Sequence, residues 1–347
     1  MIIPYLIILL FLGALIIPFS KSDVKWKQII ICVCLAVLVL FFGLRGPVGD
    51  DYYTYKQYYE SLNMADSIVF GPGFWLLNAL LRLMHLPFQC LLLAITLVSN
   101  LLLVRFVKKT GINAPLMLMI SFAMGGIANQ IDFIRNFLSI MVFVNSFDYI
   151  FEKNPRKYIL LNLIGMTFHY SSVIFIPLYW LINRDFKQKS YICIYITVIL
   201  LSFMHLHFLS FIPDVNKDSY MGHLHEYIDT YSTITIKFSM GTIERILTGL
   251  AACLCYKQLS QTKYGIIAIN SFMLYTLCYG LFSGYAILGT RLGNLFVYCH
   301  WLLWPLLLKA MPNKSLRYVS IGFMCLFMLS QILALSRLAQ WEYTLCF

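Results

Sequence analysis

Long apolar segments separated by short basic clusters dominate this sequence of 347 residues. The apolar segments run to about 15–20 residues, enough for a helix rising 1.5 Å per residue to cross a hydrocarbon core about 30 Å thick. Only 12% of the residues are charged, about half the share that is usual in water-soluble proteins. We therefore predict an all-α, polytopic integral membrane protein, a single multispan domain over residues 1–347 with about 10–12 transmembrane helices.

The basic clusters indicate how the chain is oriented in the membrane. Most of the 26 basic residues lie in the clusters Lys21/Lys25/Lys27, Arg105/Lys108/Lys109, Lys153/Arg156/Lys157, Arg184/Lys187/Lys189, Lys257/Lys263 and Lys309/Lys314/Arg317. The positive-inside rule assigns such clusters to cytoplasmic loops. The net charge of +11 is therefore a topological signal, and it does not indicate binding to nucleic acid.

A second set of arginines lies on the opposite, outer side of this topology. Arg45, Arg135, Arg245 and Arg291 each lie near the end of an apolar segment. The two longest outer loops are expected at about residues 45–69 and 205–242. This one-sided placement predicts a site for an anion at the outer surface of the membrane.

Three apolar segments deserve separate topological assignments. Phe74–Met84 has only about 11 residues, too few to span, so we expect an interfacial or re-entrant helix there. Tyr158–Trp180 has basic clusters at both ends and polar residues in the middle, which favours two short arms meeting at His169. Leu292–Leu308 is expected to be a single crossing. Polar backbone at membrane depth is tolerated where it lines a cavity.

The densest polar motif is R-G-P-V-G-D-D-Y-Y at residues 45–53. The planar fork of Arg45 suits phosphate oxygens, and Tyr52 and Tyr53 offer flat faces and hydroxyl groups to a sugar ring. The alternative is an ordinary interface loop, in which Arg45 binds lipid headgroups and the tyrosines form an aromatic belt.

Three further arginines are candidates for the same anion. Arg135 lies within an apolar pattern, where an ionisable residue usually faces a cavity or a partner; pairing with Asp132 at i,i+3 is the alternative. Arg245 could instead pair with Glu244 or Asp229. Arg291 has no acid near it in the sequence.

His169 is the candidate for proton transfer, because imidazole titrates near neutral pH. Its alternative role is to hydrogen-bond free backbone at the helix break. The pairs His205-x-His207 and His223-x-His225 lack a fixed third ligand, so no metal is expected. The ten cysteines form no C-x-x-C pair and are interpreted as small apolar side chains. The sequence has no P-loop, G-x-S-x-G or H-E-x-x-H motif, and no cofactor is expected.

These residues resemble a known family, the EpsG-type, Wzy-like polysaccharide polymerases of bacterial envelopes. The similar segments are R-x-x-V-G-x-D-Y-Y at Arg45–Tyr53, I-R-x-x-L at Ile134–Leu138, F-H-Y-S-S at Phe168–Ser172, and the late Arg245 and Arg291. Their order and spacing fit over nearly the whole chain. One departure is Gly71-Pro72-Gly73, which stands where the family often has an acid followed by proline.

The resemblance implies a multispan, GT-C-like glycosyltransferase of the bacterial inner membrane. It would join oligosaccharide repeat units carried on undecaprenyl pyrophosphate at the outer, periplasmic face, without a nucleotide sugar or metal, with O-antigen or exopolysaccharide as product. Arg45, Arg135, Arg245 and Arg291 would bind the pyrophosphate, Tyr52 and Tyr53 the sugar, and His169 or Asp51 would act as base. Membrane lipid, a chain-length regulator and a flippase are the candidate partners. A lipid-linked oligosaccharide flippase and a polysaccharide ligase are the alternatives.

Overall fold

The computed structural model describes residues 2–64, 70–206 and 235–346. This part of the chain is helical and contains no strand, apart from one isolated antiparallel bridge between Arg45 and Leu345. The expected all-α fold is therefore confirmed. The chain divides into two compact units, Met1–Leu181 with Gly322–Phe347 and Ile182–Ile321. Much of the outer loop expected at 205–242, with His207, His223, His225 and Asp229, lies outside the described residues, as does the end of the loop at 45–69.

Five helical segments of the described chain are long and apolar enough to cross a membrane. They are Ile3–Lys21, Val24–Gly43, Phe88–Thr110, Ala114–Ile131 and Lys314–Ser336. Three shorter apolar helical segments accompany them: Tyr170–Tyr179, Gln188–Met204 and Gly265–Leu281. These features confirm a polytopic membrane protein with broken helices, while the number of about 10–12 crossings stays a prediction.

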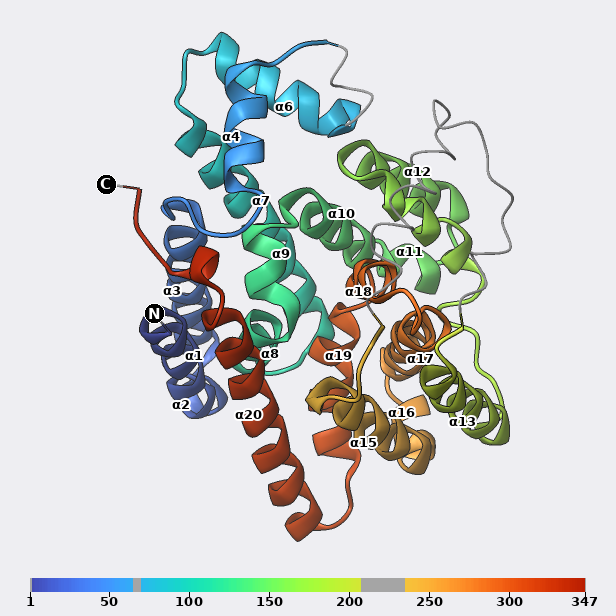
Figure 1. Cartoon of the computed structure of the whole chain (residues 1–347). Helices are drawn as coiled ribbons and strands as arrows, with labels where there is room; N and C mark the ends of the chain where they lie inside the picture. Colours follow the sequence, from blue (N-terminus) through green and yellow to red (C-terminus); the bar gives the residue numbers. More distant parts are fainter. Residues whose placement is uncertain (1, 65–69, 207–234, 347) are drawn as a thin grey trace, which may run out of the picture. The chain divides into compact units, whose positions relative to one another are not determined.

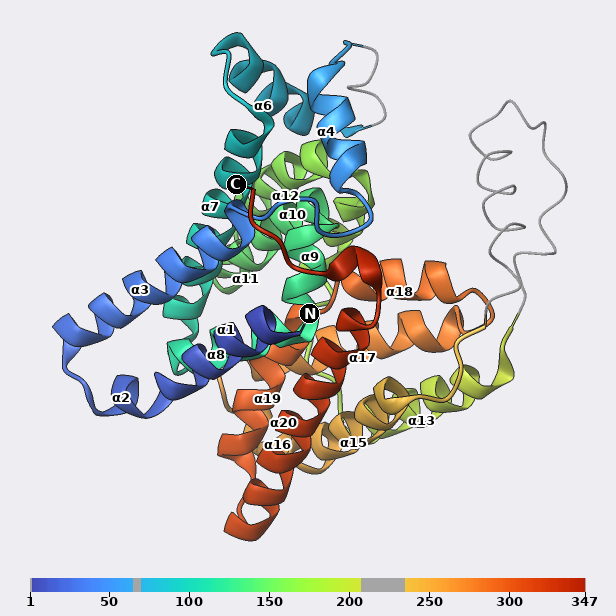
Figure 2. The same ribbon diagram turned by 60° about the vertical axis from the view of Figure 1, so that its left-hand side comes forward.

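Helices of the first unit pack around α7, as Figures 1 and 2 show. On one side α7 packs against α3, and on another against α10, which in turn packs on α12. The helices of this unit are α1 (Ile3–Ala14), α2 (Ile16–Lys21), α3 (Val24–Gly43), α4 (Tyr52–Glu60), α6 (Pro72–Leu83), α7 (Phe88–Thr110), α8 (Ala114–Ser121), α9 (Ile127–Ile131), α10 (Ile134–Asn145), α11 (Phe147–Phe151), α12 (Pro155–Phe168) and the part of α20 (Lys314–Ser336) that begins at Gly322. Proline at the N-cap of α7 and Gly111 in the left-handed conformation at its C-cap delimit this span.

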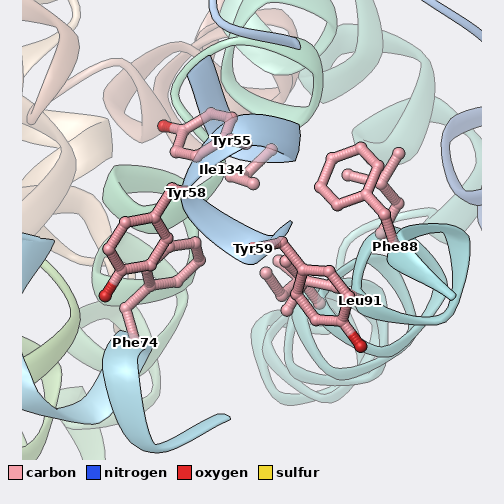
Figure 3. Close-up of a cluster of buried hydrophobic side chains, with 9 residues drawn as sticks. Tyr55, Tyr58, Tyr59, Phe74, Phe88, Leu91 and Ile134 are labelled. Carbon is pink, nitrogen blue, oxygen red and sulfur yellow. The ribbon is translucent and has the colours of Figure 1, made fainter. Parts of the chain in front are cut away.

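The short helices α4 and α6 cover the N-terminal end of α7 (Figure 2). Their apolar side chains form one aromatic cluster with α7 and α10, drawn in Figure 3. Tyr55, Tyr58 and Tyr59 of α4 are each at most 5% exposed within it. Burial of aromatic rings is among the largest apolar contributions that a side chain can make. The tyrosine-rich segment is therefore mostly packed inside the protein, although Tyr53 is 67% exposed.

His169 ends α12, as expected from the polar interruption. The residue is extended, with φ −152° and ψ 113°, and short 3₁₀ turns follow at Tyr170–Phe175 and Pro177–Tyr179. The hydroxyl group of Ser172 donates to the carbonyl of His169 at 2.7 Å, satisfying a backbone acceptor at the break. The predicted break at His169 is confirmed, and the segment at 74–84 is likewise a short helix, α6.

The second unit contains α13 (Gln188–Met204), α15 (Met240–Leu254), α16 (Tyr256–Ser260), α17 (Gly265–Leu281), α18 (Ala286–Asn294) and α19 (Tyr298–Ala310). α17 packs against α13, α18 and α19. The segment at 292–308, expected as a single crossing, is divided between two helices, because α18 ends at Asn294 and α19 begins at Tyr298; the crossing itself stays a prediction. Gly293 and Asn294 are poor helix formers at this position, which explains the interruption.

Candidate functional site

Arg45 follows the last turn of α3 and is fully buried, with 0% of its surface exposed. Its Nη1 donates to the carbonyl of Phe42 at 2.6 Å and its Nη2 to the carbonyl of Ile131 at 3.0 Å. Burial lowers the pKa of the guanidinium to about 10, an effect that the nearby Asp132 opposes. In this conformation Arg45 connects the end of α3 to α9, and it does not reach lipid headgroups. Its pyrophosphate role stays a prediction.

The glycines that follow Arg45 bring the loop against the C-terminal segment. The amide of Gly46 donates to the carbonyl of Thr344 at 2.8 Å, and the amide of Gly49 to that of Gln340 at 2.7 Å. Gly49 has φ +92°, and a Cβ there would lie only 2.0 Å from Oδ1 of Asp132. Only glycine tolerates both the conformation and the approach. These two amides therefore form hydrogen bonds to the C-terminal segment of the same chain.

Asp132 lies in the turn between the span that ends at Ile131 and α10, and it connects the loop to this turn. Its Oδ1 accepts from the amide of Asp51 at 3.3 Å, and its carbonyl accepts from the hydroxyl of Tyr55 at 2.9 Å. Burial, followed by the neighbouring carboxylates of Asp51 and Asp50, raises the pKa of Asp132 to about 7, and the bond from the Asp51 amide opposes this. The sequence indicated Asp132 only as a partner for Arg135, yet it faces Asp51.

Arg135, in the first turn of α10, is surrounded by aromatic rings. Its Cζ lies 4.9 Å from the ring centroid of Phe70, 5.6 Å from that of Phe74 and 5.9 Å from that of Tyr55. Nη1 donates to the carbonyl of Phe70 at 2.8 Å, whereas Nε is buried without a hydrogen-bond partner among the described residues. The side chain is half-buried. A held guanidinium with an unsatisfied donor is suited to bind an anion.

The glycines of Gly71-Pro72-Gly73 bring this arginine close to the end of α12. Gly71 has φ +93°, and a Cβ there would lie 2.4 Å from the carbonyl oxygen of Thr167; at Gly73 it would lie 2.2 Å from Oγ1 of Thr167. An acid at either glycine position would not fit. The Phe70 carbonyl that binds Arg135 therefore lies next to the segment that approaches Thr167, two residues before His169.

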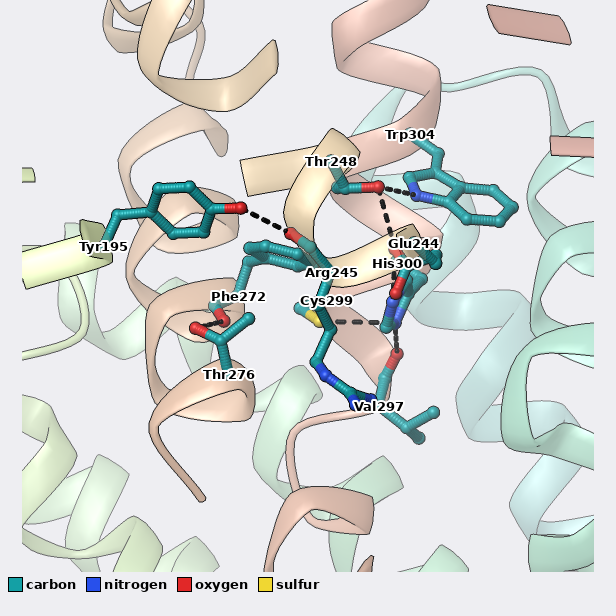
Figure 4. A network of polar contacts seen from close by, with 10 residues as sticks. All are labelled: Tyr195, Glu244, Arg245, Thr248, Phe272, Thr276, Val297, Cys299, His300 and Trp304. Carbon is teal, nitrogen blue, oxygen red and sulfur yellow. Dashed lines mark hydrogen bonds and ion pairs between the residues drawn. The ribbon is translucent and has the colours of Figure 1, made fainter. Parts of the chain in front are cut away.

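The second unit contains a buried polar network, shown in Figure 4. Oε1 of Glu244 lies 3.2 Å from Nε2 of His300 and accepts from the hydroxyl of Thr248 at 2.8 Å. Both Glu244 and His300 are 0% exposed. His300 was missed in the sequence because it lies inside an apolar segment, although an ionisable residue in such a segment is itself a signal. The alternative pairing of Arg245 with Glu244 is replaced by this pair.

Arg245 and Arg291 also belong to the second unit. The Cζ of Arg245 lies 4.2 Å from the ring centroid of Tyr279, and its Nη2 lies 3.4 Å from Oγ1 of Thr242. Arg291 is exposed in the last turn of α18. The helix dipole favours a cation there.

Comparison with known proteins adds a decisive observation, since the model of the EpsG family matches residues 28–345, nearly the whole chain. The chain belongs to the EpsG family. Membership implies a role in polysaccharide polymerisation. No curated protein and no solved structure matched the chain.

The chemistry open to this EpsG-family chain follows from the residues in each cluster. The first unit offers a guanidinium for an anion and two carboxylates, Asp51 and Asp132, close to each other. The second offers a buried carboxylate–imidazole pair beside Arg245. No group of three His, Cys, Asp or Glu side chains suited to a metal occurs in the parts of the chain that the structure describes.

Proposed function

We propose that this polymerase joins oligosaccharide repeat units carried on undecaprenyl pyrophosphate, at the outer face of a bacterial inner membrane. Arg135 is the observation that carries the proposal. Its guanidinium is held by one carbonyl and three rings, and its buried Nε donor has no partner among the residues that the structure describes. Leaving such a donor unsatisfied costs about 1–3 kcal/mol, a cost that an anionic ligand would remove.

The reaction needs two kinds of group. The hydroxyl oxygen of one repeat unit bonds to the anomeric carbon of the other, whose bond to the pyrophosphate oxygen breaks. The leaving pyrophosphate keeps the electron pair, and preorganised guanidinium groups stabilise that growing charge. We assign this contact to Arg135 of the first unit, while the binding of pyrophosphate by Arg245 and Arg291 of the second unit stays a prediction of its own. Arg45 acts as a positioning residue through its bonds to Phe42 and Ile131.

The acceptor hydroxyl must also lose its proton. His169, at the break after α12, is the proposed base, and Asp51 orients the base or the acceptor sugar, with Tyr52 and Tyr53 beside it. Asp51 is held at the start of α4 because its amide donates to Asp132. A positioned base contributes about 10²–10⁴-fold to the rate.

Gene deletion, followed by gel analysis of the surface polysaccharide, tests this function. A polymerase defect removes the ladder of long chains and leaves material capped by a single repeat unit. Loss of the capped material as well would indicate a flippase, and long chains that accumulate without transfer to their final acceptor would indicate a ligase. Complementation with Arg135→Ala should leave the single-repeat pattern, whereas Arg156→Ala, on the cytoplasmic side of the predicted topology, should restore the ladder.

A further inference from the structure

A pocket of about 620 Å³ lies in the first unit, and none of its lining residues except Tyr52 has a role in the reaction described above. It is formed where α4, the end of α6 and the start of α7 meet, all within the first unit. Its lining residues are Tyr52, Lys56, Tyr59, Glu60, Arg82, His85, Leu86, Pro87, Phe88 and Gln89. Pockets of about 300–1,000 Å³ are typical of sites for small ligands, so this one has room for a short oligosaccharide.

The charges that line the pocket favour an anion. Lys56 and Arg82 are cationic, and the only acid among the described lining residues, Glu60, is 3.9 Å from Lys56. Arg82 forms no ion pair with any residue that the structure describes. The pocket also includes the N-terminal residues of α7, where the helix dipole attracts negative charge.

The walls of the pocket favour a sugar. The rings of Tyr52 and Tyr59 pack against Phe88, with centroids 5.4 and 5.9 Å apart, which gives the pocket rigid aromatic sides. Glu60 supplies carboxylate acceptors for the hydroxyl groups of a sugar. The turn at His85 has φ +55°, rare for a side chain other than glycine, and such strain is often found at functional sites.

We propose that this pocket binds an acidic sugar of the saccharide that the polymerase extends, with Arg82 as the principal contact to the sugar's anionic group. The inference rests on the proposed function, because it takes the saccharide as the substrate. The spacing of Tyr52, Lys56 and Tyr59 at i, i+4 and i+7 places them on one face of α4, and Tyr55, on the neighbouring face, contacts Arg135. A saccharide chain held in the pocket would therefore have its reacting end close to Arg135.

Binding to the purified full chain in detergent tests the site directly, with tri-galacturonic acid as the acidic probe and maltotriose as the neutral one. The acidic probe should bind more tightly, and Arg82→Gln should weaken it about tenfold, or about 1.4 kcal/mol. Arg156→Gln, an exposed arginine far along the chain, is the matched control and should change nothing. Equal affinity for the two probes, or an unchanged affinity in Arg82→Gln, would overturn the proposal. So would an effect of Arg82→Gln confined to vesicles of phosphatidylglycerol, which would indicate a lipid site.

Chain extension from the lipid-linked repeat unit separates this proposal from the proposed function. Arg82→Gln should raise KM about tenfold and change kcat little, whereas Arg135→Ala should lower kcat. If Arg135→Ala extends chains normally, the proposed function fails, while the probe measurements still decide the pocket. If Arg135→Ala lowers kcat but Arg82→Gln changes neither KM nor probe binding, only the pocket proposal fails.

Discussion

Replacement of Arg135 is the sharpest test of the anion site, because its structural role and its catalytic role can be measured separately. Arg135→Ala removes the bond to the Phe70 carbonyl and contacts with three rings. A hydrogen bond from a charged donor contributes about 1.5–3 kcal/mol and a cation–π contact about 0.5–1 kcal/mol at an exposed site. We therefore expect a loss of about 2–4 kcal/mol in the free energy of unfolding.

The catalytic effect should be separable from this structural effect. Loss of one preorganised donor to a developing charge costs about 3 kcal/mol, which is about 100-fold in kcat. Arg135→Lys keeps a cation over the rings but loses the planar fork. It should therefore unfold almost like the wild type and still extend chains more slowly, between the wild type and Arg135→Ala.

The assay is chain extension by purified protein in liposomes, with membrane abundance and the apparent Tm measured on the same samples. Arg156→Ala is the control for removal of an exposed arginine. The reasoning is refuted if Arg135→Ala, at normal abundance, extends chains at the wild-type rate. It is also refuted if Arg135→Lys is fully active, because charge alone would then suffice.

Three further predictions follow from the contacts of the first unit. Gly49→Ala should lower the Tm more than Gly111→Ala does, because both have positive φ but only Gly49 faces a clash, with Asp132; equal shifts would contradict this. Burial raises the pKa of Asp132 to about 7, so the folded state binds this proton more tightly than the unfolded state does. The stabilisation from the protonated carboxyl is therefore present at low pH and is lost as the pH rises through about 7. Wild-type stability should fall by about 1.4 kcal/mol from pH 6 to pH 8, and Asp132→Asn should flatten this profile of the Tm. His169→Gln should slow chain extension at every pH and abolish the acid limb of the rate profile; a nearly normal rate, with a slow Asp51→Asn, would move the base to Asp51.

The features that the sequence predicted best are those that depend on local pattern. The apolar lengths predicted spans, and the polar interruption at His169 predicted the end of α12, because a helix boundary is decided within a few residues. The interruption of the segment at 292–308 was missed, since Gly293 and Asn294 are a weak local signal within apolar residues. Pairings between residues far apart in the sequence could not be predicted either, such as that of Glu244 with His300, which are 56 positions apart.

The prediction of the site residues from the sequence was limited in the same way. Arginine near the end of an apolar segment indicated an anion ligand in each case, yet Arg45 is fully buried and Arg291 is exposed. What distinguishes them is the partner that folding brings near: the carbonyl of Ile131 lies 86 positions from Arg45. The contacts of Asp132 were missed for the same reason, because its proximity to Gly49 and Asp51 depends on tertiary structure.

One short helix, α4, connects the two proposed sites of the first unit. Asp51 precedes its first residue and Tyr55 contacts Arg135, while Tyr52 and Tyr59 line the pocket on the neighbouring face. The tyrosines are mostly buried, so their rings fix the helix against α6 and α7 more than they serve as an aromatic belt. A helix held this firmly keeps a constant spacing between a saccharide in the pocket and the guanidinium of Arg135. That constant spacing is what a polymerase needs if each added repeat unit is to meet the same leaving group in the same orientation.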